Sequence, residues 1–277
     1  MIRDITIGQY YPGYSVVHRL DTRLKLILVL AYMVSVFLVS DFVGYVIVFA
    51  GLVSVIAVSK VPPRFIMRGL KPVYIIIALM FIVNLFMMPG DVITMLGPLR
   101  ITWQGLYTGI FMAFRIMLLI LGASMLTFTT KPVKLTDGIE SLLKPGVRFG
   151  VPAHELAMMM TIALRFIPTL LEETDKIMKA QQARGADFDT GSIFRRAKAL
   201  IPVFIPLLVG AFRMASDLAM AMEARCYRGG EGRTKLHVFK WRRYDTLAII
   251  IFCGYIVLIL LERYFNLQGT LTTWLFA

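Results

Sequence analysis

Long apolar runs separated by basic segments are the feature that most constrains how this chain folds. A helix needs about 20 mostly apolar residues to cross a bilayer. Five stretches approach that length, at roughly residues 24–40, 42–59, 73–89, 104–128 and 245–262. Hydrophobic residues make up 58% of the 277 positions, which is typical of membrane proteins. We therefore predict an all-α, multi-pass membrane protein with about five transmembrane helices.

The positive charges predict how the spans are oriented. Arg19, Arg23 and Lys25 precede or begin the first span, and the turn after that span contains no cation. Lys and Arg residues collect in cytoplasmic segments near membrane spans. The basic loop between the second and third spans holds Lys60, Arg64, Arg68 and Lys71. We expect a cell-membrane protein with a cytoplasmic N-terminus.

A basic block separates the fourth and fifth apolar runs. Residues 131–244 hold 19 of the chain's 30 Lys and Arg residues, against 11 of its 17 acidic ones. Such a block is suited to contact anionic lipids, acidic proteins or nucleic acid. Contact with anionic lipid and the collection of positive charge on the cytoplasmic side of a membrane explain most of this basic charge. The predicted organisation is a transmembrane region at 1–130, a cytoplasmic module at 131–244, and a fifth transmembrane helix with its tail at 245–277.

Two long amphipathic helices are predicted within this block, over residues 155–184 and 192–225. Apolar residues recur every three or four positions in the first, while Glu172, Glu173 and Lys179 take another face. Small residues and methionines suit close helix packing and adaptable contacts. Packing within the chain and contact with a partner both remain open for this set, which comprises Met158, Met159, Ala163, Ala211, Met214, Ala215, Ala219 and Met222.

Each of these helices ends in a similar three-residue word, Ala183-Arg184-Gly185 in the first and Ala224-Arg225-Cys226 in the second. A glycine after the last turn and a cation within it are ordinary features of a helix C-terminus. Arginine also offers a planar fork that binds carboxylates with two hydrogen bonds. Two such ends favour a second hypothesis, in which protruding arginines enter acidic grooves on other proteins.

The chain resembles the transmembrane T component of energy-coupling factor transporters over nearly its whole length. The resemblance lies in Gly8-Gln9-Tyr10, His18-Arg19-Leu20-Asp21, Thr129-Thr130-Lys131-Pro132, Leu164-Arg165-Phe166-Ile167-Pro168 and the two Ala-Arg words, the second of which has Cys226 in place of the usual glycine.

This resemblance implies that the two long helices cross in the cytoplasm and couple two kinds of partner. Arg184 and Arg225 would each dock into one of two ATP-binding-cassette ATPase subunits, which can be a homodimer. The apolar faces would carry a substrate-binding S component that imports a vitamin or a transition-metal ion. ATP and Mg²⁺ would be bound by the ATPases, and no nucleic-acid partner is implied.

Chemistry by the chain itself finds little support in the sequence. There is no phosphate-binding Gly-Lys-Ser or Gly-Lys-Thr loop, and His18, His154 and His237 lack metal-ligand spacing. We expect a non-catalytic subunit without its own cofactor or metal. Arg115, near the middle of the fourth span, is expected to pair within the membrane, with Asn84 and backbone carbonyls as candidate partners. The alternative function is a self-contained permease or channel.

Overall fold

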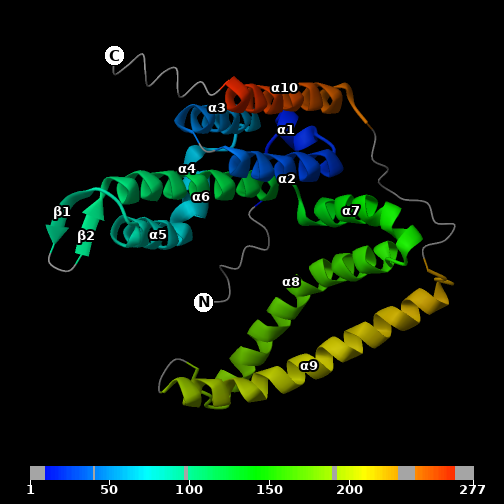
Figure 1. Ribbon diagram of the computed structural model, residues 1–277. Helices are drawn as coiled ribbons and strands as arrows, with labels where there is room; N and C mark the ends of the chain where they lie inside the picture. Colours follow the sequence, from blue (N-terminus) through cyan, green and yellow to red (C-terminus); the bar gives the residue numbers. More distant parts are fainter. Residues whose placement is uncertain (1–9, 40, 97–98, 189–191, 230–240, 266–277) are drawn as a thin grey trace. The chain divides into compact units, whose positions relative to one another are not determined.

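A computed structural model describes residues 10–39, 41–96, 99–188, 192–229 and 241–265 (Figure 1). Gly8, Gln9 and His237 lie outside these residues. The chain forms two compact units, which divide within α7 after Leu135 and again between residues 229 and 241. The first unit, here called the bundle, contains the helices before α7, both strands and α10. The second, here called the coupling hairpin, contains most of α7 together with η3, α8 and α9.

The predicted all-α class is confirmed, and a single two-stranded hairpin is added to it. The bundle comprises α1 (Val16–Arg19), α2 (Thr22–Leu38), α3 (Phe42–Ser59), α4 (Pro63–Leu70), η2 (Lys71–Val73), α5 (Tyr74–Met87), β1 (Val92–Leu96), β2 (Leu99–Thr102), α6 (Trp103–Thr129) and α10 (Arg243–Phe265). The remaining elements are α7 (Pro132–Leu143), η3 (Lys144–Phe149), α8 (Ala153–Ala183) and α9 (Ile193–Ala224).

Five described helices are long and apolar enough to cross a membrane, in agreement with the predicted number. Their membership differs from the prediction, because they are α3, α6, α10 and the two long helices α8 and α9. The first and third predicted spans form helices that are shorter, with 17 residues in α2 and 14 in α5. The helices α8 and α9 join the set because each contains a long, mostly apolar stretch. Charge gathers toward the ends of α9 and in the second half of α8.

The core of the bundle lies where α2, α3, α6 and α10 pack together. Val36, Val48, Leu118, Phe128 and Ile259 are each 1% exposed or less. Burial of large apolar side chains of this kind excludes solvent or lipid from the helix contacts and fixes their register.

Two glycines allow α6 to approach α5 closely. A Cβ on Gly105 would lie 2.8 Å from the Asn84 carbonyl oxygen, and one on Gly109 would lie 3.1 Å from the ring of Phe81. Small residues at such positions let two apolar helices come into contact through their backbones. Antiparallel strands β1 and β2 connect the two helices, with Leu96 opposite Leu99.

The coupling hairpin is formed by the two longest helices. A hydrogen bond from Gln181 Nε2 to the Pro202 carbonyl oxygen, at 3.4 Å, joins the end of α8 to the first half of α9. At the other end, Tyr227 follows α9 and contacts His154 in the first turn of α8. The helices are therefore antiparallel, and both continue through internal prolines, which are Pro168, Pro202 and Pro206.

Candidate functional site: two capped helix ends

Arg184 is the C-cap residue of α8, and the two residues that follow it close the end of the helix. The Gly185 amide donates to the Gln182 carbonyl at 2.9 Å, and the Ala186 amide donates to the Gln181 carbonyl at 3.0 Å. Gly185 has a φ of +86°, the left-handed conformation that ends many helices. This pair of hydrogen bonds is the Schellman motif, and it satisfies carbonyl groups that the helix leaves unpaired.

The end of α9 repeats this geometry around Arg225. The Cys226 amide donates to the Glu223 carbonyl at 2.8 Å, and the Tyr227 amide donates to the Met222 carbonyl at 3.0 Å. Cys226 takes a φ of +55°, although a side chain normally disfavours this conformation. The replacement of glycine by Cys226 therefore leaves the cap geometry intact, and both arginines leave their helices in the same way.

Both arginine side chains are available for an intermolecular contact. Arg184 and Arg225 are exposed, as are their neighbours Ala183, Gly185, Ala224 and Cys226. Within the described part of the chain, neither guanidinium makes a hydrogen bond or ion pair. An arginine that serves only as a cap would complement the helix dipole in the same place. Because no described residue of the chain pairs with them, these two guanidinium groups can bind a carboxylate of another protein.

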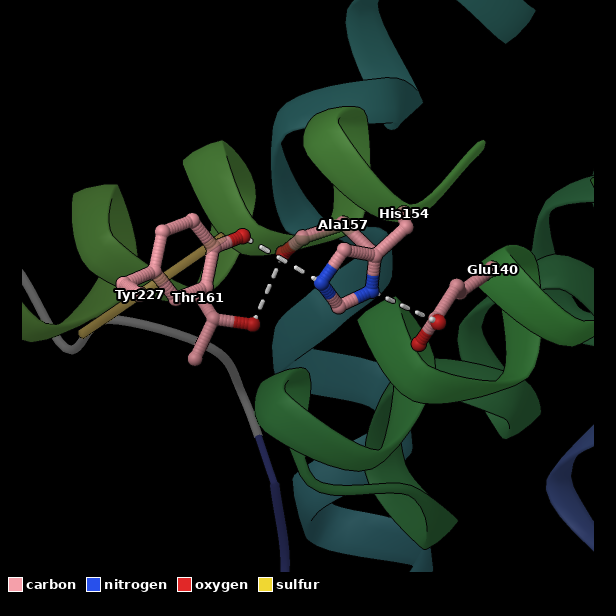
Figure 2. Close-up of polar contacts among 5 residues, drawn as sticks. All are labelled: Glu140, His154, Ala157, Thr161 and Tyr227. Atoms are coloured by element: carbon pink, nitrogen blue, oxygen red, sulfur yellow. Dashed lines mark hydrogen bonds and ion pairs between the residues drawn. The ribbon is translucent and has the colours of Figure 1, made fainter. Parts of the chain in front are cut away.

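A short polar chain fixes the position of the second end (Figure 2). Tyr227 Oη lies 3.4 Å from His154 Nε2, and His154 Nδ1 lies 3.3 Å from Glu140 Oε1. Glu140 is on α7 and His154 is in the first turn of α8, so the residue following the α9 cap is tied to two other helices. This network orients Arg225 relative to the rest of the coupling hairpin.

A cavity of about 420 Å³ lies beside Arg225. Met158 and Ile162 of α8 line one side, and Leu218 and Met222 of α9 line the other. The helices are therefore loosely packed at this end, with two methionines at the gap. Flexible methionine side chains can repack if the angle between the helices changes.

The predicted apolar contact residues fall into two groups. Met158, Ala211, Met214 and Met222 are half-buried, and both Met158 and Met222 line the cavity between α8 and α9. These two methionines therefore lie at the gap between the two helices, and their contact with a partner stays a prediction. The other four are exposed and remain candidates for a partner surface: Met159, Ala163, Ala215 and Ala219.

Sequence reasoning missed the larger part of the exposed face of α9. Ile201, Ile205, Leu208 and Phe212 are each between 45% and 68% exposed. They recur at intervals of three and four residues and so lie on one face of the helix. The same spacing continues through Ala215 and Ala219. This set of six residues, here called the outer stripe, could have been found by extending the alanine pattern toward the start of α9.

Arg115 has defined partners inside the bundle. Its Nε donates to the Tyr45 hydroxyl at 2.7 Å, and its Nη2 donates to the Val39 carbonyl oxygen at 3.0 Å. Asn84, the partner suggested from the sequence, instead donates to the Met80 carbonyl at 2.8 Å. The arginine thus joins α6 to α3 and to the end of α2, which is how a charge within a bundle is accommodated.

Comparison with known proteins identifies relatives over almost the whole chain. Residues 13–236 match the family described as Cobalt transport protein, CbiQ. A protein of Thermosediminibacter oceani is 58% identical over 249 residues, covering 90% of this chain and 94% of its own. A protein of Acidaminococcus fermentans is 51% identical, covering 95% and 98%, and one of Bacillus subtilis is 46% identical, covering 90% and 95%. All three are called energy-coupling factor transporter transmembrane protein EcfT.

Proposed function

This chain belongs to the Cobalt transport protein (CbiQ) family, and from that premise we infer that it is the transmembrane T component of an energy-coupling factor importer. It is a multi-pass membrane protein and a non-catalytic transport subunit. The alternative of a self-contained permease does not fit the names that its relatives carry.

We propose that Arg184 and Arg225 each dock into an acidic groove on one of two ATPase subunits, identical or different. The observation that carries this proposal is the matching pair of exposed arginines on identically capped helix ends. With 32 residues, α9 is about 48 Å long at 1.5 Å per residue, so the two arginines lie far enough apart to contact different subunits. ATP and Mg²⁺ are then bound by these partners.

The outer stripe is proposed to carry the substrate-binding S component. Its large apolar residues provide contact area, and Ala215 with Ala219 permits a helix to approach closely. When ATP draws the ATPases together, the docked ends move with them, and α8 and α9 shift at the loosely packed gap. The S component would respond by releasing its cargo, a vitamin or a transition-metal ion, on the cytoplasmic side.

Co-purification of the ATPases with the full chain tests the docking proposal. We expect the double variant Arg184→Glu, Arg225→Glu to lose both ATPases, because each reversal places two negative groups together at an interface centre. An arginine at the centre of a protein interface contributes about 2 kcal/mol or more to binding, so the loss of each one lowers the affinity roughly 30-fold. The double variant Arg184→Lys, Arg225→Lys retains the charge but loses the fork, so we expect intermediate retention.

A matched control reverses two exposed cations elsewhere on the same helices, in the variant Lys179→Glu, Lys198→Glu. It makes the same change in net charge and should retain the ATPases. Equal retention by the arginine and lysine reversals would refute the assigned role of the arginines. Monodisperse elution of each variant in detergent shows that it inserts and folds.

A further inference from the structure

A second cavity, of about 180 Å³, lies in the bundle where two separate sequence words meet. One is His18-Arg19-Leu20-Asp21, and the other is Thr129-Thr130-Lys131-Pro132. The cavity has several times the volume of about 30 Å³ that one water molecule occupies in the liquid. ATPase docking, as proposed above, uses neither word.

Cations dominate the lining of this cavity. Five Lys and Arg side chains contribute, from the segment before α2, from α2, from the start of α7 and from the segment before α10: Arg19, Lys25, Lys131, Lys134 and Arg242. His18 also lines the cavity, and burial lowers its pKa below 6.5, so it is largely neutral at pH 7. Among the residues that the structure describes, no carboxylate side chain lines it.

The two nearby carboxylates are already bound to backbone amides. Asp245, which is 1% exposed, accepts from the amides of Asp21 and Arg242 at 2.9 and 2.7 Å. Asp21 caps α2 by accepting from the Arg23 amide at 2.9 Å. These two charges offset part of the positive potential of the cavity, but the five lining cations outnumber them.

The buried ammonium of Lys25 gives the cavity a defined floor. Lys25 is 6% exposed, and its Nζ donates to the Thr129 carbonyl at 3.0 Å, the Thr130 hydroxyl at 3.3 Å and the His18 carbonyl at 3.4 Å. These three bonds use all the donors of the ammonium, so Lys25 adds positive charge to the cavity and no free donor. On the wall, Lys131 Nζ stands 5.6 Å from the centre of the Tyr10 ring. The outer lysines, Lys131 and Lys134, are exposed and free to close on a ligand. Cations that line one cavity repel one another, and an anion bound among them offsets that repulsion.

We propose that this cavity binds a phosphate group. Phosphate offers several strong acceptor oxygens, and Lys and Arg side chains are the groups that proteins use to bind it. Two sources share this chemistry: the headgroup of an anionic phospholipid, which the predicted cytoplasmic membrane surface supplies, and free phosphate.

The test measures thermal unfolding of the purified full chain in a neutral detergent. Dioleoyl phosphatidylglycerol, dioleoyl phosphatidylcholine, inorganic phosphate, and sodium chloride at matched ionic strength are added separately. A ligand that binds only the folded protein raises Tm in a concentration-dependent manner. The variant Lys131→Gln, Lys134→Gln removes two exposed cations of the cavity and keeps the side chain of Lys25. The control variant, Lys60→Gln, Lys71→Gln, removes two exposed cations elsewhere in the bundle.

We expect phosphatidylglycerol to raise the Tm of the wild type and the control variant more than phosphatidylcholine does, with at least tenfold weaker apparent affinity in the cavity variant. That result assigns the lipid headgroup as the source. The same pattern with inorganic phosphate, relative to chloride, assigns the free anion. The proposal is overturned if phosphatidylglycerol raises Tm no more than phosphatidylcholine does and inorganic phosphate raises it no more than sodium chloride does. It is also overturned if the cavity variant and the control variant lose affinity equally.

Discussion

Cys226 and Gly185 occupy the same position after two long helices, with φ values of +55° and +86°. The left-handed conformation costs a residue with a side chain about 1 kcal/mol or more, and glycine avoids that cost. Nothing within 4 Å would obstruct a Cβ at Gly185, so the difference between the two positions is one of backbone conformation alone. The hydrogen bonds of the cap evidently suffice to hold Cys226 in place.

The cost predicts opposite effects for two substitutions. Cys226→Gly should stabilise the last turn of α9 by about 1 kcal/mol, and Gly185→Ala should destabilise that of α8 by a similar amount. Amide hydrogen exchange reports both, at the Tyr227 and Ala186 amides that close the two caps. We expect exchange about fivefold slower at Tyr227 and about fivefold faster at Ala186. Unchanged exchange at both amides would contradict the argument.

At the scale of the elements, apolar runs and helical periodicity predicted most of the fold. The expected helix at 192–225 forms as Ile193–Ala224, and the expected span at 42–59 forms as Phe42–Ser59. The periodicity works because a helix must bury or face lipid with one consistent side. It gave no indication of the hairpin Val92–Thr102, whose strands are too short for a reliable alternation, or of the short helix Pro132–Leu143.

The candidate site was predictable only in part for a related reason. The positions of Arg184 and Arg225 follow from local helix-ending signals, which the sequence contains. The partners of Arg115 and the Tyr227–His154 contact join residues 70 or more positions apart, so no local pattern reports them. The outer stripe follows the helical spacing of Ala215 and Ala219, so its positions could be read from the sequence, but the exposure of its large apolar residues could not.

The outer stripe makes a prediction about close helix approach. The variant Ala215→Leu, Ala219→Leu adds bulk at its small residues and should reduce retention of the S component at least tenfold, because a helix can no longer approach the backbone. The ATPases should remain bound, since the arginine ends are unchanged. Quantitative pull-down from detergent-solubilised complex measures both partners in one sample.

Met220→Phe is the matched control for that variant. Met220 is 58% exposed on α9 and lies off the outer stripe by one residue, about 100° around the helix. Added bulk there should leave S-component retention unchanged. If both variants weaken the S component equally, the stripe does not define its contact surface.

At the scale of the whole molecule, the two cysteines provide a test of topology. Cys226 follows α9 and is exposed, whereas Cys253 is near the middle of the apolar helix α10. The charge distribution predicts a cytoplasmic N-terminus and a cytoplasmic 131–244 block, so Cys226 should face the cytoplasm. Cys253 should lie in the hydrocarbon region, which a charged, water-soluble reagent does not enter.

A membrane-impermeant maleimide should therefore label the chain, expressed without partners, in inside-out vesicles but not in intact cells. Cys226→Ser should abolish this labelling, and Cys253→Ser should leave it unchanged. Labelling from outside intact cells would reverse the assigned orientation. Co-expression with the ATPases adds a second readout, because docking at Arg225 covers the adjacent thiol. We expect Cys226 to be protected from labelling in the assembled complex and to be labelled again in the variant Arg225→Glu. That result would place the proposed ATPase contact at the cytoplasmic end of α9.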